Sequence, residues 1–322
     1  MVIIKNHKKP LSAAGFCLLL LFCLSIYPFL SFAQHQSSFQ AQDTMKPDQL
    51  NHNRLKMLII GGSVIYAGSM TGLYQIWYKN YPQSGFHFIN DNREWLQIDK
   101  IGHATTAYNV GMAGYETLRW AGLSKRKSAW YGGSLGFMYL TVIEILDGFS
   151  KEWGASPGDL LANTFGSAAF ISQQLLWDEQ RIQIKWSAHP TKFAEFRPEQ
   201  LGHNHAESLI KDYNGQTYWL SCNIHSFLKK DSRFPKWLNF AAGYGVDGLT
   251  GGNSNPAEAD GVPLPYFDRR RQYYLAPDID LSRIKTSSAT VNLFLKYLGI
   301  LKFPLPALEF GKKGVKFHPL YF

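Results

Sequence analysis

Four long stretches of this chain contain no charged residue, and they constrain its fold more than any other feature of the sequence. Each is rich in small and apolar side chains and is long enough for a helix of several turns. Short polar loops separate them, so successive helices would run antiparallel around one core. We therefore predict a four-helix bundle over residues 55–180. The four stretches are 57–78, 103–115, 128–143 and 160–177.

The ends of the predicted helices carry capping residues. Ser156 followed by Pro157 is typical of a helix start, because a serine side chain accepts a backbone N–H and proline suits the first helical position. Gly148 is typical of a helix end. We expect helices over residues 55–78, 99–120, 128–146 and 157–177.

The first charge-free stretch is long enough to cross a bilayer. Aromatic residues such as Trp77 and Trp177 lie at the ends of the predicted helices, as they do at membrane–water interfaces. Recurring glycines such as Gly61 and Gly62 favour close helix contacts in a membrane and in water alike. We expect the bundle to associate with a bilayer, with membrane lipid or envelope proteins as partners. A soluble bundle with tightly packed helices is the alternative, and the oligomeric state stays open.

Residues 1–33 have the pattern of a secretory signal peptide, with three lysines before a long apolar run. Ser31 and Ala33 satisfy the small-residue cleavage rule, so we expect the mature chain to begin at Gln34. An uncleaved membrane anchor is the alternative. Residues 34–54 are polar and without periodicity, which predicts a disordered spacer.

Charge and cysteine content limit the class of protein. The formal net charge is +9, and removal of the three leader lysines leaves 30 basic against 24 acidic residues, or +6. No compact basic block occurs beyond residues 269–271, so we expect no nucleic-acid partner. Cys17 and Cys23 lie in the leader without a lipoprotein processing pattern, which leaves Cys222 alone and no intramolecular disulfide. We place the protein in the cell envelope, periplasmic or membrane-associated.

The character of the chain changes after residue 180, and we predict an irregular α+β extension over residues 181–322. Residues 198–213 fit a helix. Asn214-Gly215 is a tight-turn signal, followed by a predicted strand over 216–222. A short helix is expected from Pro235, and a last helix over 290–301. The fold class predicted for the whole chain is therefore mainly α.

Three short polar signatures interrupt the apolar sequence. They read DKIGH, EILDG and SPGDLLANTFG, and each places two polar side chains three or four residues apart, on one face of a helix. Facing helices are where bundle proteins build metal and acid–base sites. The candidate cluster is Asp99, His103, Glu144, Asp147, Asp159 and Asn163, of which His103, Glu144 and Asp159 would suit a divalent metal such as Zn, Mn or Fe.

Each of these residues also has a structural interpretation. Asp159 lies three positions after Ser156, close to a capping box, and Asp99 also fits a helix cap. Glu144 resists such an explanation, because it lies within an apolar run where an unpaired carboxylate is costly to bury. His203 and His205 form a second, weaker metal candidate, since such histidines are usually exposed.

The ordered signatures DKxxH, ExxDG and SxxDxxANxxG resemble the YfiM family of bacterial envelope proteins, a domain of unknown function that is distantly similar to VanZ-like membrane proteins. The resemblance covers about residues 55–180 and implies roles for the six cluster residues together with Lys100 and Gly166. Smaller members of the family look like lipoproteins, whereas this chain lacks the lipoprotein cysteine and adds residues 181–322. The family implies no established reaction.

These observations predict an exported envelope protein of unknown biochemical activity. A membrane-associated structural or assembly component is the first hypothesis. The alternative is a membrane-proximal hydrolase, or metal-dependent enzyme, that acts on lipid or cell-wall material through the Asp/His/Glu/Asn cluster.

Overall fold

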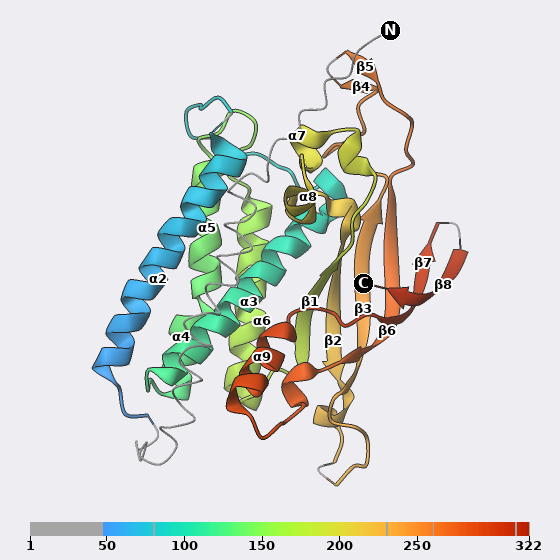
Figure 1. The fold of residues 1–322 in the computed structure, drawn as a ribbon. Helices are drawn as coiled ribbons and strands as arrows, with labels where there is room; N and C mark the ends of the chain where they lie inside the picture. The colour runs from blue at the N-terminus through green and yellow to red at the C-terminus, as the bar shows by residue number, and fades with distance from the viewer. Residues whose placement is uncertain (1–47, 80, 230, 260, 313, 322) are drawn as a thin grey trace.

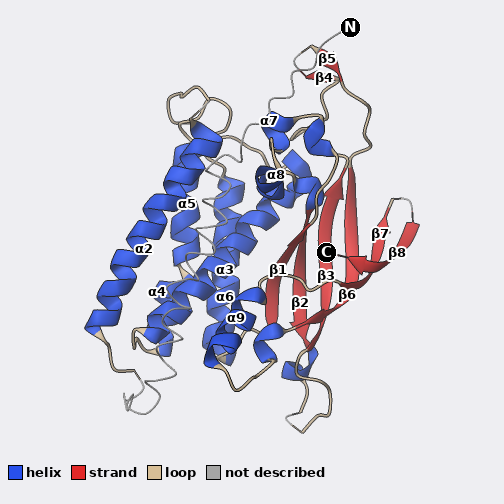
Figure 2. Cartoon of the chain, viewed as in Figure 1, coloured by secondary structure: helices blue, strands red, loops and turns tan. Residues whose placement is uncertain are grey.

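The computed structural model describes residues 48–321 except positions 80, 230, 260 and 313. The predicted signal peptide and most of the predicted spacer lie outside the described residues. The described chain forms two layers, with helices on one side and one large antiparallel sheet on the other (Figure 1, Figure 2). The axes of helices α2, α5 and α6 and of the first strands of the sheet are roughly aligned (Figure 1).

The helical layer contains the predicted helices, but one of them is divided. The helix predicted over 128–146 is two helices that meet at Ser134, because Gly132 and Gly133 favour a helix little and leave the backbone free to turn. The elements are α2 (His52–Leu73), η1 (Tyr74–Tyr78), η2 (Glu94–Gln97), α3 (Ile98–Trp120), α4 (Lys125–Gly133), α5 (Leu135–Asp147) and α6 (Pro157–Trp177).

Glycines allow α3 to pack very closely against its neighbours. A Cβ atom at Gly136 of α5 would lie 2.1 Å from the Ala107 carbonyl oxygen of α3. A Cβ atom at Gly166 of α6 would lie 2.0 Å from the Ala104 carbonyl oxygen. These contacts bring the backbones of three helices together, as small residues do wherever helices cross at short distance. Helix α3 is therefore the centre of the layer.

Helix α2 lies at the outer side of this layer. Among the described residues it is the one helix with the length and hydropathy needed to cross a bilayer, and 6% of its apolar window is buried. Its side-chain cap, Asn51, accepts from the backbone N–H groups of Asn53 and Arg54. The helix is thus well formed but presents its apolar side chains outwards.

The C-terminal half corrects the predicted fold class. The prediction of a mainly helical protein, a four-helix bundle with an irregular α+β extension, is wrong, because a six-stranded antiparallel sheet makes up a full second layer. The strand order is β1-β2-β3-β6-β7-β8, and β4 (Glu258–Ala259) pairs separately with β5 (Val262–Pro263). The strands of the large sheet are β1 (Ile182–Ala188), β2 (Gln216–Asn223), β3 (Leu238–Asp247), β6 (Arg270–Ile279), β7 (Leu305–Gly311) and β8 (Gly314–Tyr321).

The sequence of strand β3 shows why its pattern does not predict a sheet. Trp237, Phe240 and Tyr244 recur at spacings of three and four, which favours a helix, yet these residues flank or belong to a strand. The buried side of β3 carries small and polar residues instead of large apolar ones. Gly243 is needed there, because a Cβ atom would lie 2.7 Å from the Trp219 ring on β2. The alternation exists, but in the first half of β3 the large apolar residue, Phe240, faces outwards.

Two predicted elements of the C-terminal half are confirmed, and a third is divided. Strand β2 and the last helix, α9 (Ala289–Leu298), lie where they were expected. The helix predicted over 198–213 is broken into α7 (Pro198–Leu201) and α8 (His205–Lys211) at Gly202, whose φ of +103° no helix tolerates. The remaining single-turn elements are η3 (Phe193–Glu195), η4 (Tyr213–Gly215), η5 (Ile224–Phe227) and η6 (Leu281–Arg283).

The two layers are joined through α3. At its start, Ile98 packs with Tyr218 of β2 and Val246 of β3. Further along, Tyr108 packs with Phe170 of α6 and Ile184 of β1 in a second cluster. The first turns of α3 are therefore fixed against both layers.

The α3–α6 contact can be tested with one methyl group. Gly166→Ala should lower the free energy of unfolding by about 1–3 kcal/mol, because the added Cβ would press on the α3 backbone. Gly62→Ala in α2 is the matched control, since nothing lies within 4 Å of its Cβ position and alanine favours a helix by about 1 kcal/mol. Denaturant unfolding measures both; equal stability of the two variants would show that α3 and α6 do not pack this closely.

Candidate functional site

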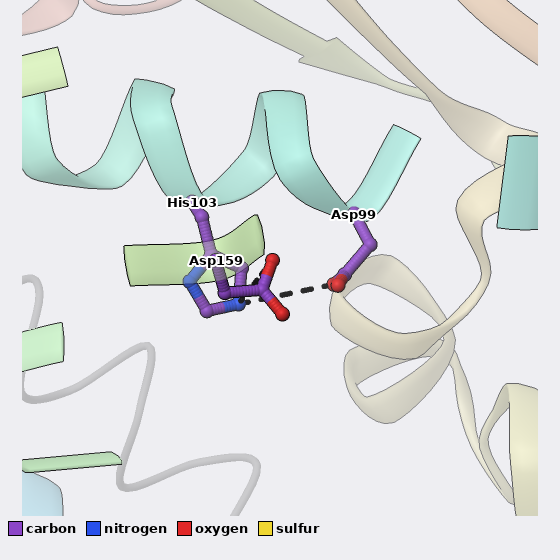
Figure 3. Close-up of side chains that lie close together, drawn as sticks. All are labelled: Asp99, His103 and Asp159. Carbon is purple, nitrogen blue, oxygen red and sulfur yellow. Dashed lines mark ion pairs between the residues drawn. The ribbon is translucent and has the colours of Figure 1, made fainter. Parts of the chain in front are cut away.

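The polar residues of the three signatures meet where α3 and α6 begin and α5 ends. Asp99 and His103 lie in the first turns of α3 and approach Asp159 of α6 (Figure 3). Asn163 lies one turn further along α6, and Glu144 in the last turn of α5. We call this set the polar junction; it comprises Asp91, Asp99, Lys100, His103, Glu144, Asp159 and Asn163.

The turn before α3 sets the direction of the side chains that α3 contributes to the polar junction. Trp95, Leu96 and Gln97 have φ values of 48°, 53° and 65°, a left-handed conformation that costs roughly 1–2 kcal/mol per residue. Contacts to the sheet layer offset this strain. The Trp95 backbone N–H donates to the Gly252 carbonyl, and the Tyr244 hydroxyl donates to the Leu96 carbonyl. The sheet thus fixes the direction in which Asp99 and His103 point.

His103 occupies the centre of the polar junction. Its Nδ1 atom lies 3.1 Å from Asn163 Oδ1 and 3.7 Å from Glu144 Oε1. Its Nε2 atom lies 4.0 Å from Asp99 Oδ1 and 4.0 Å from Asp159 Oδ1. The surroundings of the two ring nitrogens therefore differ: Nδ1 faces an amide and a carboxylate, and Nε2 faces two carboxylates.

Lys100 binds the Oδ2 atoms of Asp99 and Asp159 and of a further carboxylate, Asp91. Its ammonium lies 2.6 Å from Asp91 Oδ2, 2.9 Å from Asp159 Oδ2 and 3.5 Å from Asp99 Oδ2. The Tyr213 hydroxyl donates to Asp99 from the sheet side. Asp91 and Tyr213 were not predicted from the sequence, because neither is at helical spacing from the signatures.

Glu144 is buried as the sequence implied, with 3% of its side chain exposed. It is partnered, because the Ser156 backbone N–H donates to its Oε2 atom at 2.9 Å. Ser156 also caps α6 as predicted, accepting the Asp159 N–H at 3.1 Å, and its hydroxyl donates to Asp91. Glu144 therefore ties the end of α5 to the start of α6.

Asp147 is separate from the centre of the junction. Its Oδ1 atom accepts a 2.6 Å hydrogen bond from the buried Tyr78 hydroxyl, at the end of η1. This contact anchors the segment after α2 to α5. Of the six predicted cluster residues, Asp147 is the one that the structure gives a partner of its own, away from His103.

The second histidine candidate lies elsewhere. His203 pairs with Glu199 at 3.1 Å, and both side chains are largely exposed. His205 begins α8. Among the described residues, these histidines have only local surface contacts, away from the polar junction.

One further motif has the spacing of a nucleophile elbow. Residues 132–136 read Gly-Gly-Ser-Leu-Gly, but that motif requires a turn from a strand into a helix, and this segment joins two helices. The Ser134 hydroxyl donates to the Trp130 carbonyl at 2.8 Å. The glycines serve helix packing, since a Cβ at Gly132 would lie 2.4 Å from the Tyr115 nitrogen. The segment is structural.

A cavity of about 790 Å³ opens between α3, α6 and α9, away from the polar junction. Its lining includes Tyr108, Met112 and Phe170 as well as Glu116 and Lys296. Access to the junction is instead through its own edge, where 18% of the His103 and 23% of the Asp99 side chain are exposed.

The charges of the polar junction do not balance. Asp91, Asp99, Glu144 and Asp159 contribute four carboxylates, and Lys100 contributes one ammonium. His103 adds at most one more positive charge. Within the described residues, Asp159 Oδ1 is buried with no hydrogen-bond partner. The polar junction therefore has the charge for a further cation, and ligand atoms of Asp99, His103 and Asp159 lie within 4.8 Å of one another.

Residues 87–174 match a protein family described as "Predicted periplasmic lipoprotein (DUF2279)". The match contains the whole polar junction and none of the large sheet. No curated protein and no solved structure matches the chain. The match supports an uncharacterised bacterial envelope family, so the protein is exported and associated with the cell envelope. It indicates no biochemical activity, and the finer likeness to YfiM and VanZ-like proteins stays a prediction.

The pH dependence of stability tests the Lys100–Asp91 contact. Burial alone raises the pKa of the Asp91 carboxyl, but hydrogen bonds from Lys100 and Ser156 outweigh it and lower that pKa. A lowered folded-state pKa stabilises the protein above the unfolded value of about 3.8, and this stability is lost as the pH falls through the folded value. Asp91→Asn should therefore cost most stability above about pH 5 and least near about pH 2. Unfolding at several pH values measures this; a cost that does not change with pH would contradict the contact.

Proposed function

We propose that this envelope protein is a structural or assembly component in which Asp99, His103 and Asp159 bind a divalent cation. The observation that carries the proposal is the unpartnered Oδ1 atom of Asp159. A buried polar atom left without a partner costs about 1–3 kcal/mol, and more when it is charged. One ligand atom from each of the three residues lies within 4.8 Å of the others, a spacing that one metal ion can bridge.

The ring of His103 gives independent support. With Asn163 Oδ1 facing the ring, the Nδ1 atom of His103 donates in their hydrogen bond, and Asn163 Nδ2 is left buried without a partner in the described part of the chain. A neutral ring then carries its lone pair on Nε2, which faces the Oδ1 atoms of Asp99 and Asp159. A lone pair facing two carboxylates is repulsive, so this arrangement favours a positive charge between the three atoms, either a metal ion or a proton on Nε2.

The neighbouring residues are arranged as outer partners of metal ligands. Lys100 holds the Oδ2 atom of Asp159 at 2.9 Å, which turns Oδ1 toward His103. Asn163 fixes the ring orientation of His103. Such outer contacts set the tautomer and direction of metal ligands. The mix of one imidazole and two carboxylates suits Zn²⁺, Mn²⁺ or Fe²⁺.

The structural role follows from the origin of the ligands. Asp99 and His103 belong to α3 and Asp159 to α6, and Glu144 of α5 borders the same ring. A divalent cation here would offset most of the surplus negative charge that gathers where the three helices converge. It would stabilise the folded protein by its differential binding to the folded state.

A cation-dependent hydrolase is the second candidate, and the exposed edge of the site favours it. Three protein ligands leave coordination positions for water, which is the arrangement of catalytic zinc sites. The partly exposed His103 and Asp99 side chains face that open side. Lipid or cell-wall material is the substrate class that an envelope location would offer.

Metal binding by matched variants tests the proposal. Asp159→Asn keeps the shape of the side chain and removes the charge whose Oδ1 atom has no hydrogen-bond partner among the described residues, whereas Asp147→Asn changes a carboxylate that bonds to Tyr78 instead. Loss of an outer partner alone weakens metal binding by about 10–100-fold, so Asp159→Asn should lose at least about tenfold and Asp147→Asn little. Elemental analysis and titration with Zn²⁺ or Mn²⁺ measure both.

Thermal melts with and without chelator separate the outcomes. For a structural cation, chelator lowers the melting temperature of the wild type and of Asp147→Asn but not of Asp159→Asn. Metal binding together with chelator-sensitive hydrolysis of phospholipid or cell-wall material would favour the hydrolase. Absence of bound metal with an unchanged melt would refute the cation and leave protons on His103 and on carboxyls such as Glu144, whose pKa burial raises, to offset the charge.

A further inference from the structure

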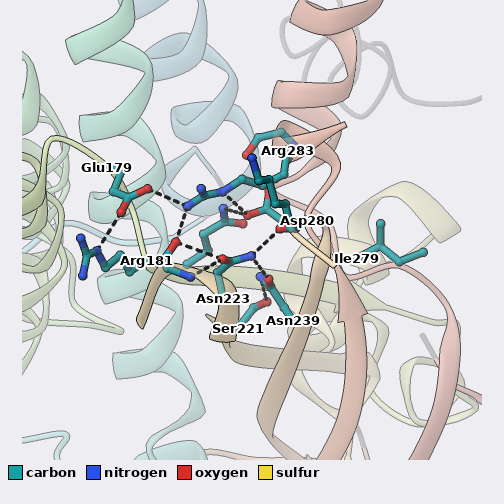
Figure 4. Close-up of polar contacts among 12 residues, drawn as sticks. Glu179, Arg181, Ser221, Asn223, Asn239, Ile279, Asp280 and Arg283 are labelled. Carbon is teal, nitrogen blue, oxygen red and sulfur yellow. Dashed lines mark hydrogen bonds and ion pairs between the residues drawn. The ribbon is translucent and has the colours of Figure 1, made fainter. Parts of the chain in front are cut away.

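The two faces of the large sheet have opposite character. One face, which we call the inner face, carries a buried polar network. Lys185 and Asp278 are fully buried, and the Lys185 Nζ atom lies 2.6 Å from Asp278 Oδ2. The Ser221 hydroxyl donates to Asp278 at 2.6 Å, and Asn239 donates to Ser221 at 2.9 Å. Figure 4 shows Ser221, Asn223 and Asn239 in contact across neighbouring strands.

The other face of the sheet is apolar; it packs on α3 at Tyr218 and Val246 and is exposed beyond that contact. The strand registers place Leu220 opposite Ala242, Ala242 opposite Leu275, Leu275 opposite Leu308, and Leu308 opposite Phe317. Leu275 is 54% and Phe317 60% exposed. We call this the outer face; its large residues are Leu220, Phe240, Leu275, Leu308, Val315 and Phe317. In water, a sheet buries its apolar face and exposes its polar one, so this arrangement is inverted.

Among the described residues, the charged side chains near the outer face lie at its ends. On β6 the exposed Arg271 lies at one end, and the outward positions that follow are Tyr273, Leu275 and Pro277. At the other end the exposed Lys236 precedes β3. Strands β3 and β6 have 10 residues each, and a strand that crosses a bilayer needs about 9–11. The uncharged band therefore has the height of a hydrocarbon core.

The helical layer presents a similar surface. Ile60 and Val64 of α2 are each 67% exposed, and Leu161 and Phe165 of α6 also face outwards. These helices run in roughly the same direction as strands β1 to β3 (Figure 1). One bilayer oriented across that direction would cover the exposed apolar side chains of both layers.

We propose that the outer face contacts the hydrocarbon of a lipid bilayer, so that the sheet as well as the helices lies in the membrane. A second copy of the chain would cover one face and leave the apolar surface of the other layer in water. Residues 34–47 offer few large apolar side chains, only Phe39 and Met45, and suit the outer face poorly. Lipid satisfies both layers at once. This inference stands apart from the proposed cation, because it uses none of the junction residues.

Fluorescence quenching by lipid tests the proposal on the full mature chain. Single cysteines replace Leu275 or Phe317 in a Cys222→Ser background and carry a bimane label. Tyr266→Cys is the matched control, since Tyr266 is 89% exposed in the loop before β6, outside the band. The proteins are reconstituted in phosphatidylethanolamine–phosphatidylglycerol vesicles that contain doxyl-labelled phosphatidylcholine, and iodide serves as the aqueous quencher.

The proposal predicts that doxyl lipid removes most of the fluorescence at Leu275 and Phe317 while iodide does not, and that the Tyr266 control shows the reverse. Quenching by iodide at Leu275 and Phe317 would place the outer face in water and overturn the proposal. Protection from both quenchers, with crosslinking between labelled chains, would assign the outer face to a second copy and overturn it equally. Circular dichroism of each variant checks that the chain has folded.

Discussion

A buried surplus of negative charge at the start of α3 is the constraint on which the rest of the structure depends. Carboxylates from the loop before α3, from α3 itself, from α5 and from α6 converge there, and Lys100 provides one fixed positive charge among them. Burial of unpaired charge is costly, so the elements that supply these groups must be held in place by their neighbours. The glycine contacts of α3 and the strained turn from Trp95 to Gln97 provide that support. The same arrangement leaves Asp159 Oδ1 free, and the proposed cation follows from that oxygen.

The sheet and the junction depend on each other through α3. Tyr213 reaches Asp99 from the sheet side, and Tyr244 of β3 holds the turn that leads into α3. The matched family segment ends before β1, so this support comes from outside it. If the outer face lies in lipid as proposed, the membrane orients the sheet, and the sheet in turn orients the junction.

The sequence predicted the helices and the convergence of the signatures far better than it predicted the sheet. Helical spacing of polar pairs, as for Asp99 with His103, survives in the structure because each pair needs only its own helix. Contacts between distant segments, such as Asp91 with Lys100, have no periodic signal, so they escaped prediction. The sheet escaped because its alternation is inverted: Phe240 and its neighbours on the outer face imitate a helical pattern, and the buried positions are small or polar.

Anomalous diffraction from crystals of the mature protein grown with Zn²⁺ or Mn²⁺ tests the central claim most directly. The account predicts one anomalous peak between Asp99 Oδ1, His103 Nε2 and Asp159 Oδ1, at about 2.0–2.2 Å from each ligand atom for Zn²⁺. Lys100 should remain bound to the Oδ2 atom of Asp159. A junction without an anomalous peak, in crystals that contain the metal, would contradict the account and show that protons on His103 and on the buried carboxylates offset the charge instead.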